Sequence, residues 1–351
     1  MTTRNLSPQQ MFSNWTKTHR PEYRFSGKDR KSFMAWKKKT LPKVLATLGE
    51  SPPKVPAKPE MLAQWEEKDL VRQRWIIDVQ KYLSAILLVN IPQGLKKKEK
   101  RPAILCCHGH GQFGKEPVMG NDSSSELRQA IVQHGYNYGQ IMAQKGFITY
   151  SLDWIGFGER NDNNKPNHCS LSAGRDWCNL YYLHVTMLGM TSLSINVAHG
   201  KAATDVVISL PNVDKNNLGV MGLSGGGTMS LWMTLCDNRI KATEIICYSD
   251  LWAAFGIRDI NYCGMQVAPG LFKLVDLPDL QGLIAPRPLL IDIGVHDMCF
   301  KVDTAMKCQK QLSAIYRAAG TADQLALDLH PGGHGWGANK SEAFFRQHLH
   351  G

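Results

Sequence analysis

Leu218-Gly-Val-Met-Gly-Leu-Ser224-Gly-Gly-Gly227 is the stretch around which the rest of the chain is organised. Its first half is an apolar run typical of a buried strand, and an apolar helical pattern follows from Met229 to Leu235. Between them, Gly222-Leu-Ser-Gly-Gly226 fits the G-x-S-x-G pattern of a sharp strand-to-helix turn that exposes a nucleophilic serine. Glycines on both sides of the serine allow strand and helix to pass without Cβ clashes. The alternative is a glycine-rich turn without catalysis, but the flanking strand and helix favour the nucleophile.

Apolar runs and helical patterns alternate along most of the chain. We expect strands at about residues 71–80, 85–91, 102–107, 147–152, 218–222, 242–248, 288–293 and 325–329. We expect helices at about residues 126–144, 192–210, 302–318 and 340–348. This order predicts an α/β fold, with a mainly parallel central sheet and helices on both of its faces.

The first 65 residues differ from the rest and are predicted to form an N-terminal helical arm with a proline-rich linker. A helical pattern runs from Ser32 to about Gly49, with Pro42 as a break or restart, and residues 51–59 are rich in proline. Because so short a segment makes a thin core, the arm should pack on the main domain. Residues 66–351 are predicted to form that α/β domain, with insertions at about 161–189 and 250–282.

Charge and composition limit the partners of the protein. The formal net charge is +11, and lysines cluster at residues 37–39 and 96–101. No aromatic stacking pattern accompanies these runs, and the second is expected in a hairpin loop between two strands, so we interpret them as solvated surface and predict no nucleic-acid partner. The longest apolar run, residues 82–91, is too short to cross a bilayer, so no membrane association is predicted.

Cysteine usage and the start of the chain indicate a cytoplasmic protein. The nine cysteines are an odd number without metal-ligand spacing, which is typical of reduced core residues. Residues 1–15 lack the basic start and apolar core of a signal peptide. The sequence leaves the oligomeric state open.

Polar residues follow the predicted strands where a functional site is expected. In open α/β sheets, ligands bind beyond the carboxyl ends of the strands. The stretches in that position are His108-Gly-His-Gly111, Asp153-Trp154, Ser224, Gly294-Val-His-Asp297 and His330-Pro-Gly-Gly-His334-Gly-Trp336. The order Ser224, Asp297, His334 is one of the known chain orders of a serine, acid and histidine triad.

The histidine and the acid each have alternatives. His334 lies among glycines in a loop that can aim its imidazole, whereas His330 sits at the strand end and His296 precedes the acid. Asp250 follows another strand and is the main alternative to Asp297 as the acid. Two further aspartates are disfavoured: Asp292 lies inside its strand, and Asp153 begins what looks like a structural turn.

From about residue 30 onward, the chain resembles the dienelactone-hydrolase-like and acetyl-xylan-esterase-like branch of the α/β-hydrolases. The matching motifs are His108–Gly111, Asp153–Arg160, Gly222–Gly226, Pro286–Asp297 and Gly332–Trp336. The resemblance implies that Ser224 is the nucleophile, Asp297 the acid and His334 the base. The dienelactone hydrolases use a cysteine where this chain has Ser224, so their reaction is a weaker guide and ester hydrolysis is favoured.

Stabilising an oxyanion requires two backbone donors. We expect them to be the amide of Gly225, which opens the helix after the serine, and the amide of His110 in the first glycine-containing loop. His108 and His110 could instead bind a metal, but no third ligand is evident, so we predict neither metal nor cofactor.

The two insertions follow strands on the active side and are expected to shape a pocket or lid. Trp154, Trp252 and Trp336 are candidate substrate contacts, although a tryptophan is more often part of the core. The sequence thus predicts a serine-dependent carboxylesterase acting on short-chain, acetyl-like esters of a small molecule or carbohydrate. A serine peptidase on the same fold and a catalytically silent ligand-binding protein are the alternatives.

Overall fold

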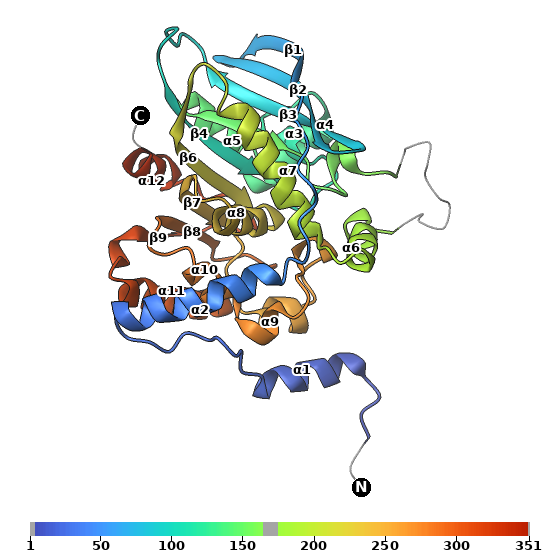
Figure 1. Ribbon diagram of the computed structural model, residues 1–351, viewed down its shortest axis with the longest axis vertical. Coiled ribbons are helices and arrows are strands. Elements are labelled where there is room, and N and C mark those ends of the chain that lie inside the picture. Colours follow the sequence, from blue (N-terminus) through green and yellow to red (C-terminus); the bar gives the residue numbers. More distant parts are fainter. Residues whose placement is uncertain (1–3, 164–174, 350–351) are drawn as a thin grey trace.

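The computed structural model describes residues 4–163 and 175–349. These residues form a nine-stranded sheet with the strand order β1-β2-β3-β5-β4-β6-β7-β8-β9 (Figure 1). The first three strands are antiparallel to their neighbours, and the strands from β5 to β9 in the sheet run parallel. The strand bounds are β1 (Glu60–Glu67), β2 (Leu70–Gln80), β3 (Leu83–Pro92), β4 (Arg101–Cys107), β5 (Ile148–Leu152), β6 (Val213–Leu223), β7 (Ile240–Ile246), β8 (Leu289–Gly294) and β9 (Leu325–His330).

Helices cover both faces of this sheet, which confirms the predicted fold class (Figure 1). One core cluster joins the sheet to α2, α7, α8, α10 and α11, and a second joins its other face to α3, α5 and α12. The helix bounds are α1 (Pro8–Thr18), α2 (Arg30–Ala46), α3 (Lys115–Val118), α4 (Ser125–His134), α5 (Tyr138–Gln144), α6 (Trp177–Met187), α7 (Ser192–Val207), α8 (Gly225–Cys236), α9 (Leu271–Leu274), α10 (Leu277–Gly282), α11 (Val302–Ala319) and α12 (Ser341–His348).

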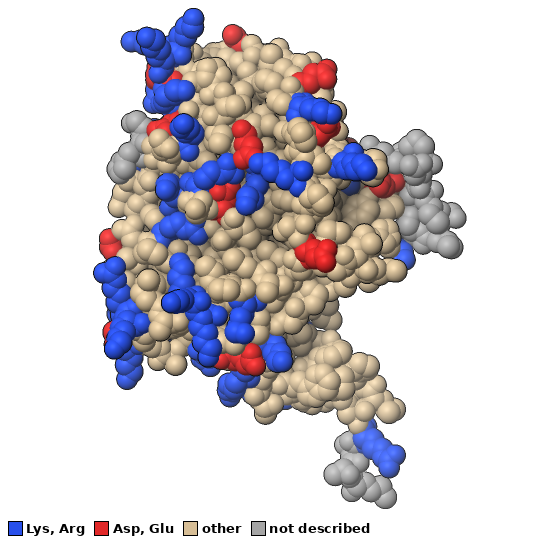
Figure 2. All heavy atoms as spheres, in the orientation of Figure 1, with Lys and Arg blue, Asp and Glu red and all other residues tan. Residues whose placement is uncertain are grey.

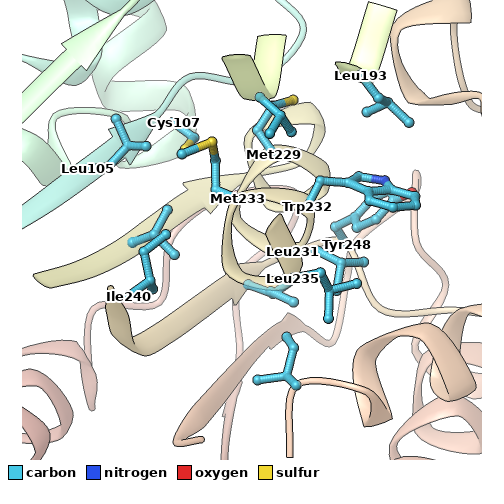
Figure 3. Close-up of a cluster of buried hydrophobic side chains, with 14 of the residues drawn as sticks. Leu105, Cys107, Leu193, Met229, Leu231, Trp232, Met233, Leu235, Ile240 and Tyr248 are labelled. Carbon is cyan, nitrogen blue, oxygen red and sulfur yellow. The ribbon is translucent and has the colours of Figure 1, made fainter. Parts of the chain in front are cut away.

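Helix α8 lies at the centre of the larger core. Met229, Leu231, Trp232 and Met233 are all buried, and they pack among side chains from strands and from α7 (Figure 3). Burial all round explains why this helix is apolar on every side rather than amphipathic. A helix fixed in this way holds its first residue, Gly225, in a defined position.

Several expected elements differ from those observed. Pro42 does not break its helix, because α2 continues to Ala46 and buries Phe33 and Val44 against the main core. The helix expected over residues 126–144 is two helices, α4 and α5, since Gly135 adopts a left-handed conformation (φ 58°) that ends α4. The strand β1 and the helix α6 have no counterpart among the predicted elements.

The basic loop at residues 96–101 does not join a hairpin. Strands β3 and β4 are not neighbours, because β5 lies between them, so the loop is a crossover connection. Figure 2 shows lysine and arginine side chains spread over one face of the molecule, including the region of α2 and α11. None of the helices within the described residues is long and apolar enough to span a bilayer.

The N-terminal segment lies against the region that follows β7. The backbone amides of Glu22 and Tyr23 donate to the carbonyls of Lys273 and Leu274 at 2.9 and 2.7 Å. The amide of Phe25 donates to Asp279 at 2.9 Å. Part of the expected insertion at 161–189, namely residues 164–174, lies outside the described residues.

Candidate active site

Ser224 occupies the tight turn between β6 and α8, in a conformation (φ 59°, ψ −118°) that non-glycine residues rarely adopt. Its amide donates to the carbonyl of Ile246 at 2.8 Å. A Cβ on Gly222 would lie 2.5 Å from the carbonyl oxygen of Gly226, and one on Gly226 would lie 2.0 Å from that of Cys107. Only glycine fits at either position, because α8 begins so close to β6 and β4 that a side chain would clash with the backbone. This close approach explains the two glycines of the motif.

Asp297 and His334 are hydrogen-bonded to each other. His334 Nδ1 lies 2.9 Å from Asp297 Oδ2, while Asp297 Oδ1 accepts from the amides of Cys299 and Phe300 at 2.7 and 3.0 Å. Burial acts to raise the pKa of Asp297, but its bonds to His334 and to the two amides outweigh burial, so the pKa lies below its usual value. Asp297 is therefore an ionised carboxylate that orients the imidazole.

Ser224 and His334 line one cavity of about 230 Å³, together with the loop from Gly109 to Gly114.

Residues that the sequence did not single out contact His334 and hold its imidazole in place. The ring of Phe300 stacks on that of His334, with centroids 5.8 Å apart and planes at 16°. His134 Nδ1 lies 2.6 Å from the carbonyl oxygen of His334. No sequence motif marks Phe300 or His134, because their role depends on three-dimensional packing alone.

The two expected oxyanion donors lie close together. The Cβ position of Gly225 is 3.5 Å from the amide nitrogen of His110. The preceding amide, that of Gly109, already donates to the hydroxyl of Tyr136. Because Gly225 also opens α8, the positive end of the helix dipole favours negative charge at the same place.

The other candidate histidines have different surroundings. His108 is fully buried; its Nε2 accepts from the amide of Trp154 at 2.9 Å, and its Nδ1 lies 2.8 Å from the carbonyl oxygen of Gly109. Burial lowers the pKa of His108 to about 4, so the ring is neutral. His330 Nε2 lies 3.0 Å from Asp292 Oδ1, and His296 is exposed.

The alternative acids are engaged elsewhere. Asp250 Oδ1 accepts from the amide of Leu251 at 2.6 Å, and burial raises its pKa to about 6. Asp153 accepts from the amide of Lys115 and from its ammonium group, both at 2.8 Å. Asp153 and Lys115 are both almost completely buried, so we interpret their ion pair as structural.

The tryptophans need correction as substrate contacts. Trp154 is fully buried, with its ring 3.5 Å from the Cβ position of Gly200 in α7. Trp336 is also buried and donates to Ser341 at 2.8 Å. Trp252 lines a second, apolar cavity of about 110 Å³, apart from the one that contains Ser224. The expectation was wrong for Trp154 and Trp336 because their rings turn into the core instead of toward the strand ends.

A third potential metal ligand exists for His110, contrary to the expectation from sequence. His110, Cys178 and Cys263 place their ligand atoms within 4.8 Å of one another. Their distance along the chain hid this grouping. His108 is not part of it, since both of its ring nitrogens already have partners.

Comparison with known proteins agrees with the fold. A model of the Abhydrolase family matches residues 2–315, so the chain belongs to this family. It is 24% identical over 290 residues to "Putative hydrolase YtaP" of Bacillus subtilis (strain 168), covering 82% of this chain and 90% of that protein. The predicted resemblance to the α/β-hydrolases is thereby confirmed.

Solved structures share the fold. One, described as a "putative acetyl xylan esterase" from Bacteroides fragilis, superposes with a TM-score of 0.73 at 18% identity, covering 93% of this chain and 83% of that one. A glucuronoyl esterase from Solibacter usitatus gives a TM-score of 0.61 at 16% identity, covering 91% and 92%. At these identities the likeness concerns the fold.

Proposed function

We propose that this member of the Abhydrolase family is a serine-dependent hydrolase of carboxylic esters, acting on short-chain acyl groups such as acetyl. The observation that carries the proposal is the 2.9 Å hydrogen bond between His334 and Asp297, in the wall of a cavity that Ser224 also lines. Nucleophile, base and orienting acid are the three groups that acyl transfer by a serine requires.

In this mechanism Ser224 Oγ attacks the ester carbonyl while His334 Nε2 removes its proton. Asp297 holds the Nδ1 proton of the imidazole and stabilises the imidazolium that forms. The amides of Gly225 and His110 donate to the oxyanion of the tetrahedral intermediate. His334 then protonates the leaving alkoxide, and water releases the acyl group by the same steps in reverse order. The reaction needs no cofactor.

Two observations support a small acyl group and a carbohydrate ester. The cavity at Ser224 measures about 230 Å³ among the described residues, which is enough for a small acyl group. The structural neighbours include a protein described as a "putative acetyl xylan esterase", whose name places the sugar on the alcohol side of the ester, and a glucuronoyl esterase, whose name places the sugar on the acyl side. We therefore propose small-molecule or carbohydrate esters as substrates, in a cytoplasmic setting without nucleic-acid or membrane partners.

The test is a comparison of Ser224→Ala with the wild type. The variant should fold with an unchanged melting curve but lose ester turnover by a factor on the order of 10⁴ or more, because the covalent step disappears. A fluorophosphonate probe should label the wild type at Ser224 and leave the variant unlabelled. Turnover that survives the substitution would end the assignment.

The same preparations separate the alternatives. A serine peptidase would cleave peptide amides as well as esters, whereas an esterase should show ester turnover alone. A silent binding protein would show no turnover on p-nitrophenyl esters or acetylated sugars, even with a folded chain.

A further inference from the structure

Three soft metal ligands from separate parts of the chain converge beside the candidate oxyanion loop. His110 follows β4, Cys178 lies in α6, and Cys263 immediately precedes the short helix η4 (Gly264–Gln266). The Sγ atom of Cys178 is 3.5 Å from His110 Nε2, and all three ligand atoms lie within 4.8 Å of one another.

These distances match a tetrahedral zinc ion. With Zn–S near 2.3 Å and Zn–N near 2.0–2.1 Å, the sulfur-to-nitrogen edge of the tetrahedron is about 3.5 Å and the sulfur-to-sulfur edge about 3.8 Å. The first agrees with the distance between Cys178 and His110, and the second lies within the spacing of the group. Two thiolates and an imidazole suit zinc, whereas magnesium and calcium prefer oxygen ligands.

The surroundings hold the cysteines in place without an ion. Cys178 and Cys263 are only 2% and 7% exposed, while His110 is exposed and gives access from solvent. The amide of Gly264 donates to Asn179 Oδ1 at 2.7 Å, which joins the two cysteine-bearing segments. Cys263 caps η4, so that its sulfur accepts a hydrogen bond from the amide of Gln266. Such outer hydrogen bonds support a metal thiolate.

Other groupings of this kind are less suited to an ion. Cys247 lies near Asp292 and His330, and also near Asp297 and His334. In each grouping the carboxylate and imidazole are already paired with each other, at 3.0 and 2.9 Å. In the grouping around His110, no carboxylate of the described residues is hydrogen-bonded to the imidazole, and Nε2 faces Cys178 instead.

We propose that His110, Cys178 and Cys263 form a zinc site, with water as the fourth ligand. Binding releases the two thiol protons, so that the ion, two thiolates and a neutral imidazole make a site without net charge. The ion would tie the loop after β4 to α6 and to the segment before η4. If the proposed function holds, it would also steady the backbone amide of His110 beside Gly225.

The test measures metal binding by the reduced full-length chain. After incubation with excess Zn²⁺ and gel filtration, the wild type should retain about one zinc per chain. With Co²⁺ it should show thiolate-to-cobalt charge-transfer absorption and the intense visible bands of a four-coordinate ion. Cys178→Ser, Cys263→Ser and His110→Gln should each weaken zinc binding by more than roughly tenfold. The matched control is Cys236→Ser, which changes a half-buried thiol outside the cluster and should bind as the wild type does.

Several results would overturn the site. They are the absence of a cobalt–thiolate band in the wild type, unchanged binding in His110→Gln and Cys263→Ser, and a disulfide between Cys178 and Cys263 that forms even when the protein is kept in reductant. If a cysteine variant fails to fold, His110→Gln decides, because that side chain is exposed. Zinc binding should be unchanged in Ser224→Ala, so a failure of the esterase proposal would leave this result intact.

Discussion

Replacing Asp297 with asparagine should invert the hydrogen bonding of His334 without changing the shape of the site. Asp297 Oδ1 accepts from two backbone amides, those of Cys299 and Phe300, and Oδ2 faces His334 Nδ1. In the variant only the carbonyl oxygen of asparagine can accept from those amides, so its NH₂ group must face Nδ1. The imidazole then has to accept at Nδ1 and carry its proton on Nε2, which points at Ser224 in the proposed mechanism.

The expected loss in kcat follows from this tautomer. A histidine protonated on Nε2 cannot remove the serine proton, and the charge that stabilises the imidazolium is also gone. In a serine protease triad, the same change of aspartate to asparagine lowers kcat by about 10⁴-fold, which corresponds to roughly 5.5 kcal/mol. The melting temperature should change little by comparison, because the two backbone hydrogen bonds remain.

The assay compares kcat for p-nitrophenyl acetate in the wild type, Asp297→Asn and Asp250→Asn, with a melting curve for each. Asp250→Asn is the matched control, since this buried acid also follows a strand but bonds to the amide of Leu251. It should retain most of the activity. If Asp250→Asn were inactive while Asp297→Asn kept its activity with normal melting, the acid would follow β7 and our reasoning would be refuted.

Three further predictions concern stability and substrate. Burial raises the pKa of Glu244 to about 8. The free energy of unfolding should therefore fall as the pH rises from about 4.5 to 8, by about 1.4 kcal/mol per pH unit, because the folded state keeps a proton that the unfolded state loses. Glu244→Gln should melt at a higher temperature than the wild type at pH 9 and at the same temperature at pH 5. Lys115→Met should leave Asp153 buried without its cation and cost about 3–5 kcal/mol in urea unfolding, whereas an unchanged midpoint would contradict the role of the pair. Acetyl esters should turn over faster than dodecanoyl esters, and the reverse order would refute the short-acyl proposal.

The sequence could reveal the parts of the fold that are buried on both faces. Parallel strands such as β4 and β8 are buried and mostly apolar, so their carboxyl ends, and the polar residues after them, could be located. The rule that ligands bind at those ends then grouped Ser224, Asp297 and His334. The structure places Ser224 and His334 in the wall of one cavity and Asp297 behind the histidine, and the variants above test their roles.

The elements that were not predicted lack such a regular apolar pattern. Every residue of β1 is exposed, so this edge strand carries no buried apolar pattern and depends on pairing with β2. The helix α6 lies in a stretch whose composition indicates an irregular insertion, and α4 ends at Gly135 although the periodicity continues. Sequence periodicity also cannot show which way a side chain turns at a strand end, which is why Trp154 is expected in a pocket and lies in the core.

The loop after β4 is firmly held at both of its ends but less so in the middle. At its start, His108 accepts from the amide of Trp154. At its end, Lys115 is paired with Asp153, and a Cβ on Gly114 would lie 2.1 Å from that carboxylate. His110 lies between these anchors, where the ring of Phe157 meets it edge-on at 5.1 Å and Cys178 approaches at 3.5 Å. An oxyanion donor must be positioned before the reaction begins, because reorganising it costs part of the stabilisation it provides. A zinc ion on the side chain of His110 would add a further support between the two anchors, so metal content and kcat should rise together if both proposals hold.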